Sequence, residues 1–177
     1  MTRVASQLTF CSPQQILRRT VVEQDEQNRI TRLFSLDGSP VESAQTLFFD
    51  GILSRGIVSL KENKFPGTVD QLLADYLYID ISTQLPVEKI RPNGKPLLLD
   101  FGTSSPDKIN SQLEALAPAL TTFSVFDIIA AGVYYPLILL GLQAELTVKC
   151  CTSVLIWENV DLVHMCITGK TRIRRIN

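Results

Sequence analysis

Strand-type sequence lies at both ends of this chain, and helix-type sequence lies between them. Alternating patterns rich in β-branched and aromatic residues predict strands over residues 3–10, 16–24, 29–36, 46–49 and 51–60, and again over 146–148, 153–157 and 172–176. Turn-forming clusters at Asp25–Asn28, Asp37–Pro40 and Asp50–Gly51 separate the early strands. Because a strand needs partners for its backbone groups, we expect the two ends to pair in one sheet system, with the middle as an insertion.

The middle of the chain predicts helices and one buried strand. Apolar residues at helical spacing follow Thr68, a predicted N-cap, as far as Tyr78. The apolar run Leu97–Phe101 is typical of a short buried strand. Further helices are predicted over 106–116 and from Ser124, another N-cap, to about residue 140, where Pro136 should kink the helix or make it restart.

Composition narrows the classes of function. The 177 residues are 45% apolar and 20% charged, which is typical of one globular domain, with room for a small annex. A net charge of −1 provides no field that would attract nucleic acid. The apolar run 125–142 is shorter than a usual membrane span and contains Asp127 and Pro136, so we expect a buried helix and no membrane partner. Residues 1–10 lack the apolar segment of a secretory signal, so we expect a cytoplasmic protein.

Metal-binding and disulfide-forming residues are sparse. Four cysteines (Cys11, Cys150, Cys151 and Cys166) form neither a disulfide framework nor a CxxC motif, and His164 is the single histidine. We therefore expect reduced thiols, no metal site and no cofactor.

Several segments resemble the amidohydrolase (metal-dependent hydrolase) superfamily, in particular its deaminase-like branch. Gly51–Leu60 is similar to the strand that leads, in these enzymes, directly into a metal-binding His-x-His pair. Leu98–Ser105 is similar to their last barrel strand, and Ser124–Leu142 resembles a helix of the deaminase-type members. The resemblance implies an α+β protein whose residues 1–60 and 143–177 form a composite, β-sandwich-like domain.

The same resemblance implies that a catalytic barrel has been lost. Family members carry a (β/α)8 barrel between the two halves of the sandwich, and such a barrel needs about 200 residues or more. The segment Lys61–Phe123 offers only 63 residues. We therefore expect residues 61–142 to form a reduced α/β or helical insertion.

The residues that bind metal in the family are replaced here. Lys61 and Asn63 stand where the His-x-His pair is expected, and Ser104 stands where the last-strand aspartate is expected. A hydrolytic metal site needs several such ligands to activate water. The sequence thus favours a non-catalytic, amidohydrolase-like protein. Association with a protein partner, most simply a second copy in a homodimer, would cover the apolar surface left by a lost barrel.

Another interpretation is a small-molecule binding protein, or a metal-independent enzyme, with a pocket near Lys61, Asp100 and Ser104. A buried lysine can act as a base or nucleophile, and polar residues that follow an apolar strand often bind ligands. The structural alternatives are a solvated Lys61, and an Asp100 that caps the next helix together with nearby hydroxyls. Tyr134 and Tyr135 are candidate binding residues that can equally belong to an interface or to the core.

Overall fold

The computed structural model describes residues 1–37, 45–83, 90–150 and 153–176. Within these ranges, six strands form one mixed sheet in the order β3-β2-β1-β4-β7-β8. They are β1 Thr2–Ser12, β2 Gln15–Gln24, β3 Ile30–Ser35, β4 Thr46–Arg55, β7 Val154–Glu158 and β8 Arg172–Ile176. β1 and β4 are parallel, and the other neighbours are antiparallel. The α+β class is confirmed, and so is the pairing of both chain ends, which meet where β4 lies beside β7.

The Asp50–Gly51 pair is a bulge within β4, so the predicted turn is wrong. Ser6 of β1 pairs with Phe49, but Leu8 pairs with Ile52, so one residue of β1 faces two residues of β4. Gly51 has a φ of 137°, a backbone conformation that side chains disfavour. The predicted strand over 51–60 is also too long, because β4 ends at Arg55.

The predicted strand over 146–148 does not form, and the segment 146–150 instead runs from the end of β1 to the start of β3. The Leu146 N–H donates to the Cys11 carbonyl at 3.0 Å, and the Lys149 N–H donates to the Ile30 carbonyl at 2.7 Å. Lys149 has a φ of 73°, which bends the chain away from an extended path. The Ile30 N–H donates in turn to the Cys150 carbonyl at 3.1 Å, so the segment makes one pair of hydrogen bonds with Ile30 and no ladder along 146–148.

The middle of the chain forms helices and a second, two-stranded parallel sheet. Its elements are α1 Val69–Asp75, β5 Leu77–Asp80, β6 Leu97–Asp100, α2 Pro106–Leu116, α3 Val125–Ile129 and α4 Tyr135–Leu139. A 3-10 turn, Ala117–Ala119, follows α2, and a π-helical turn, Ala130–Tyr134, joins α3 to α4. Whether this middle segment is a separate domain stays a prediction.

Both predicted N-caps are confirmed. The Thr68 hydroxyl accepts from the Gln71 N–H at 3.3 Å, and the Ser124 hydroxyl accepts from the Asp127 N–H at 3.2 Å. The predicted helix from Thr68 to Tyr78 is too long, however. It ends at Asp75 because Tyr76 is extended, with a φ of −130° and a ψ of 151°, and the chain then enters β5.

Pro136 explains the π-helical turn. Proline has no N–H, so it cannot bond to the carbonyl of Gly132, four residues earlier. That carbonyl accepts instead from the Val58 N–H at 3.1 Å, which ties the segment after β4 to the helical layer. Gly132 also allows close packing, because an added Cβ would lie only 3.2 Å from the Phe101 ring. The helix continues from α3 through the π-helical turn into α4, where the Tyr135 N–H donates to the Ala130 carbonyl, so the expected restart does not occur.

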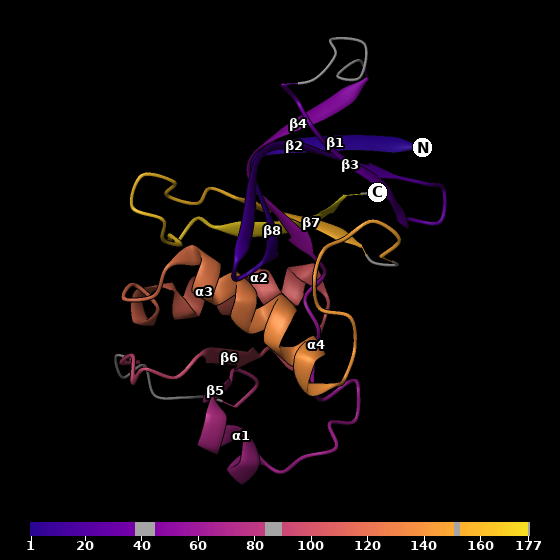
Figure 1. The fold of residues 1–177 in the computed structure, drawn as a ribbon. Helices are drawn as coiled ribbons and strands as arrows, with labels where there is room; N and C mark the ends of the chain where they lie inside the picture. Colours follow the sequence, from indigo (N-terminus) through magenta and orange to yellow (C-terminus); the bar gives the residue numbers. More distant parts are fainter. Residues whose placement is uncertain (38–44, 84–89, 151–152, 177) are drawn as a thin grey trace.

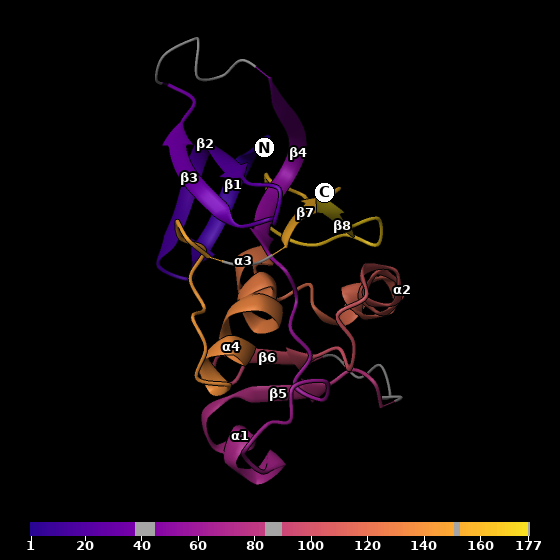
Figure 2. The ribbon, with the colours of Figure 1, turned by 90° about the vertical axis from the view of Figure 1, so that its right-hand side faces the viewer.

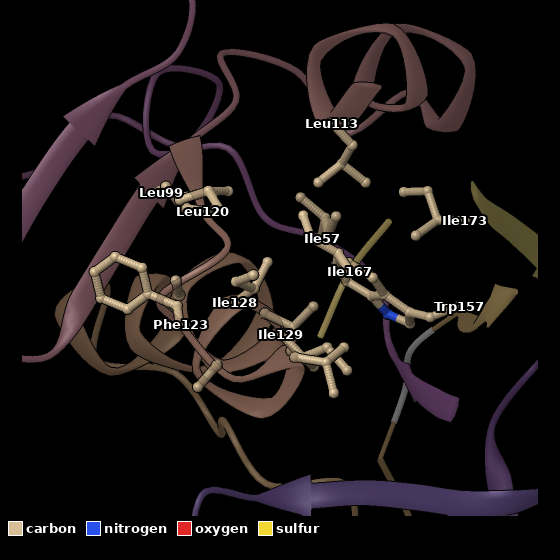
Figure 3. Packing of buried hydrophobic residues seen from close by; sticks show 14 of the residues in the cluster. Ile57, Leu99, Leu113, Leu120, Phe123, Ile128, Ile129, Trp157, Ile167 and Ile173 are labelled. Atoms are coloured by element: carbon tan, nitrogen blue, oxygen red, sulfur yellow. The ribbon is translucent and has the colours of Figure 1, made fainter. Parts of the chain in front are cut away.

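The helices lie between the two sheets. In Figures 1 and 2, α3 and α4 separate the six-stranded sheet from β5 and β6, and α1 lies beyond β5. The main core fills the space between the large sheet and the helices (Figure 3). At most 1% of the surface of its residues Trp157, Ile129 and Leu113 is exposed. Each such buried aliphatic side chain contributes about 1.5–3 kcal/mol. No helix in the described ranges is long and apolar enough to span a membrane.

Candidate functional site

Two aspartates end the two strands of the small sheet. Asp80 is the last residue of β5 and Asp100 the last residue of β6, and they are partners in the parallel register. Ligands in α/β proteins commonly bind outside the carboxyl ends of parallel strands. This end of the β5–β6 sheet is therefore the natural place to look for a site.

Lys61 reaches this end from the turn that follows β4. Its Nζ lies 2.8 Å from Asp80 Oδ2 and also donates to the Ser82 hydroxyl. Asp80 Oδ1 accepts from the Ser82 N–H at 3.1 Å and from the Ser82 hydroxyl at 2.7 Å. Burial by itself would raise the pKa of Asp80, but the hydrogen bonds from Lys61 and Ser82 lower this pKa below its ordinary value. Asp80 is thus a carboxylate whose two oxygens are already engaged.

Asp100 is the most deeply buried charged residue at this end, with 1% of its surface exposed. Its Oδ1 accepts from the Gly102 N–H at 3.0 Å, and its Oδ2 faces the Tyr78 hydroxyl at 3.4 Å. Burial raises the pKa of Tyr78, and the negative charges of Asp100 and Asp80 raise it further. Tyr78 therefore stays a protonated donor at neutral pH.

These side chains border a hollow of about 270 Å³, which we call the β5–β6 hollow. Its polar members are Lys61, Lys64, Tyr78, Asp80 and Asp100. Its remaining members are mostly apolar and come from the turn after β4 and from α1: Leu60, Phe65, Gly67, Val69 and Leu72. The hollow thus combines charged groups at the strand ends with an apolar wall.

The structure brings two of the three expected pocket residues to this hollow. Lys61 and Asp100 border it, but Ser104 does not, and its hydroxyl instead donates to Glu62 Oε2 at 3.0 Å. The capping alternative is wrong for this loop. Ser105, the N-cap of α2, makes no side-chain capping bond, and Asp100 bonds to Gly102.

Tyr134 and Tyr135 are not among the residues that border the hollow, although Tyr135 packs against the cluster of Leu60 and Leu72 behind its wall. Their ring centroids are 5.4 Å apart, and Tyr135 is also 5.4 Å from Tyr76, in edge-to-face contacts. Burial raises the pKa of Tyr135. Both rings are half-buried against the core, which fits the core alternative better than a pocket.

Sequence reasoning missed Tyr78, Asp80 and Lys64. A signal for Asp80 was present, because Leu77–Asp80 and Leu97–Asp100 are both short apolar runs that end in aspartate. Comparing these two runs would have predicted a matched pair of strand ends. Within the described ranges, no group of three or more His, Cys, Asp or Glu side chains is placed to hold a metal ion.

No family model matches this chain, and no curated protein matches it. Among solved structures, it is similar to N-acetyl-D-glucosamine-6-phosphate deacetylase from Mycobacterium smegmatis, with 15% sequence identity and a TM-score of 0.26. The match covers 70% of this chain and 33% of the deacetylase, so the chain spans about a third of that enzyme's length.

Proposed function

We propose that this protein binds a small molecule in the β5–β6 hollow. One observation supports this most strongly: the register partners Asp80 and Asp100 end two parallel strands beside one hollow, with Lys61 bonded to the first. Asp100 is 1% exposed, and burying a charged group costs free energy, so a fold that places one beside a hollow has often done so for function.

The groups at the hollow suit binding by hydrogen bonds and charge. Asp100 is an acceptor, Tyr78 is a donor, and Lys64 adds a second positive charge beside Lys61. The volume lies just below the usual range of about 300–1,000 Å³ for ligand sites, so the ligand is small. We propose binding without hydrolysis, because Lys61, Asn63 and Ser104 replace the expected metal ligands.

A thermal-shift screen tests this proposal. A ligand that binds only the folded state raises the unfolding temperature, and a concentration one hundred times the Kd stabilises by about 2.7 kcal/mol. We expect small amines, carboxylates or sugars to include such a ligand, and Asp100→Asn to reduce its effect. Asp107→Asn, at an exposed position on α2, is the matched control. A ligand that stabilises Asp100→Asn as well as wild type does not bind here, and a screen without any ligand refutes the proposal.

A relation to the amidohydrolases is a further part of the proposal. It is supported by the sequence pattern of Gly51–Leu60 and of Leu98–Ser105. Under this proposal the chain retains the composite sheet and lacks the hydrolytic centre. Metal-dependent hydrolysis of amide or amine substrates by the purified protein would contradict it.

Self-association is a second candidate function, favoured by the exposed half of β4. Leu47 and Phe48 are 55% and 64% exposed, and β7 pairs only with Ile52–Arg55. Within the described ranges, Thr46–Asp50 therefore has no strand on its β7 side, and unprotected strand edges invite pairing with another chain.

Sedimentation velocity tests the second candidate. We expect a homodimer at micromolar concentrations, and Phe48→Glu should make the protein monomeric. Val163→Glu, at a position that is 87% exposed, should leave the dimer intact. A wild-type monomer at every concentration, or a dimer that survives Phe48→Glu, would exclude this surface.

A further inference from the structure

The charges around the β5–β6 hollow are not evenly paired. Lys61 is bonded to Asp80, whose second oxygen is bonded to Ser82. Asp100, in contrast, has a backbone N–H and a tyrosine hydroxyl as its hydrogen-bond donors. Among the described residues, no lysine, arginine or histidine nitrogen lies within 4.0 Å of its carboxyl oxygens. Within the part of the chain that the structure describes, Asp100 therefore has no positively charged partner.

The bonds of Asp100 indicate that it is an acceptor towards the hollow. Both of its oxygens face N–H or O–H donors, which is the arrangement of an ionised carboxylate. The contact with Tyr78, at 3.4 Å, is long for an O–H donor, so Oδ2 retains capacity for a stronger hydrogen bond. A charged donor would supply one and would offset the cost of burying the carboxylate.

Part of the wall of the hollow is apolar. Leu60 and Leu72 are 3% exposed and belong to one cluster, against which the Phe65 ring packs. Phe65 is held in place, since its ring also lies against Gly67, where an added Cβ would be 2.3 Å from it. An aromatic face near a cation provides further stabilisation. The wall suits a short apolar group attached to the charged donor.

We infer that the ligand of the hollow carries a primary ammonium group that donates to Asp100, joined to a short apolar group that contacts Phe65 and Leu72. This inference rests on the proposed function, because it names the chemical class of the ligand at the same site. Lys64 is exposed at the hollow and disfavours a second positive charge, so the ligand is a monoamine or an amino acid whose carboxylate contacts Lys64.

Isothermal titration calorimetry with four related probes tests the inference on the whole chain. The probes are phenethylamine, its neutral isostere 2-phenylethanol, the anion phenylacetate, and phenylalanine. We expect phenethylamine to bind at least tenfold more tightly than 2-phenylethanol, and phenylacetate to bind more weakly than either. Phenylalanine binding more tightly than phenethylamine would indicate amino acids as the ligand, and the reverse order would indicate simple amines.

Asp100→Asn provides the matched variant, because it keeps the shape and removes the charge. It should weaken phenethylamine binding at least tenfold and change 2-phenylethanol binding by less than threefold. Asp107→Asn, at an exposed position on α2, should change neither. If Asp100→Asn does not fold, the wild-type comparison of amine with alcohol still decides the question.

The outcomes separate the two proposals. If 2-phenylethanol or phenylacetate binds as tightly as phenethylamine, the ammonium inference is wrong and the small-molecule proposal stands. If Mg²⁺ or Ca²⁺ binds in competition with the amine and more tightly, the hollow is a cation site and the amine inference is also wrong. If none of the four probes binds and the thermal-shift screen is also empty, both proposals fail together.

Discussion

Gly51→Ala should destabilise the protein strongly. An added Cβ at this position would lie 2.0 Å from the Trp157 carbonyl oxygen, a backbone atom of the neighbouring strand β7. Because real Cβ atoms essentially never approach below 3.0 Å, β4 and β7 would have to separate by about 1 Å or more. The φ of 137° adds strain for any residue with a side chain.

The expected loss follows from these two costs. A sparsely populated backbone conformation costs about 1–3 kcal/mol, and each ladder hydrogen bond broken beside Trp157 costs about 0.5–1.5 kcal/mol. We expect the free energy of unfolding to fall by about 3 kcal/mol or more, within a total that is typically about 5–15 kcal/mol. For a chain of this size, that loss lowers the unfolding temperature by about 6–12 °C.

Urea unfolding followed by tryptophan fluorescence measures the change, because Trp157 is the single tryptophan and lies at the affected contact. Gly169→Ala is the control, since nothing lies within 4 Å of its added Cβ and its φ is not positive. It should be neutral or stabilise by about 0.4–1 kcal/mol. A loss below about 1 kcal/mol for Gly51→Ala would refute the view that β4 and β7 meet at this glycine.

Three further predictions concern buried and paired groups. Ser54→Ala should lower the free energy of unfolding, measured by urea titration, by about 1–3 kcal/mol, because the buried Trp157 Nε1–H then loses its acceptor, the Ser54 hydroxyl 2.8 Å away. When Trp157 is already replaced by Phe, the same Ser54→Ala change should cost much less. The pKa of Asp80 is lower in the folded than in the unfolded state, so its contribution to the free energy of unfolding should be complete above the unfolded pKa and disappear as the pH falls through the folded pKa. In acid unfolding experiments, Asp80→Asn should therefore make the free energy of unfolding less dependent on pH in this range. An unchanged pH dependence would contradict the ion pair. Burial, with a smaller contribution from the charge of Glu145, raises the pKa of Cys11 to about 11. A thiol reagent at pH 8 should therefore label the partly exposed Cys166 before Cys11. Equal labelling rates of the two cysteines, measured by peptide mapping, would count against a buried Cys11.

Local signals predicted the parts of the fold that depend on a few neighbouring residues. Thr68 and Ser124 act as N-caps because the bonds that define a cap lie within three residues. The alternating strands at the two ends also predicted their pairing, since each leaves backbone groups that require a partner.

Non-local contacts decided the parts that were predicted wrongly. An Asp-Gly pair is equally compatible with a turn and with a bulge, and the pairing of β4 with β1 on both sides of Gly51 selects the bulge. Tyr76 and Leu77 continue a helical pattern, yet they leave the helix because Leu77 pairs with Leu97, twenty residues later.

The site was predictable in the same partial way. Asp100 was found because it ends an apolar run, and Lys61 because of the strand pattern before it. Asp80 was missed because its run was assigned to a helix, and Ser104 was expected at the pocket but bonds to Glu62 instead. The pairing of β5 with β6 is signalled only when the two similar runs, twenty residues apart, are compared with each other.

The position of β4 between β1 and β7 has a consequence for how the chain folds during synthesis. Ser54 of β4 and Trp157 of β7 are bonded across 103 residues of sequence. At about 5–20 residues per second, a ribosome needs about 5–20 s to make that interval. During those seconds one edge of Ile52–Arg55 is unpaired, because β7 has not yet been made. A nascent chain stalled in this interval should therefore be the form that chaperones bind and that aggregates most readily.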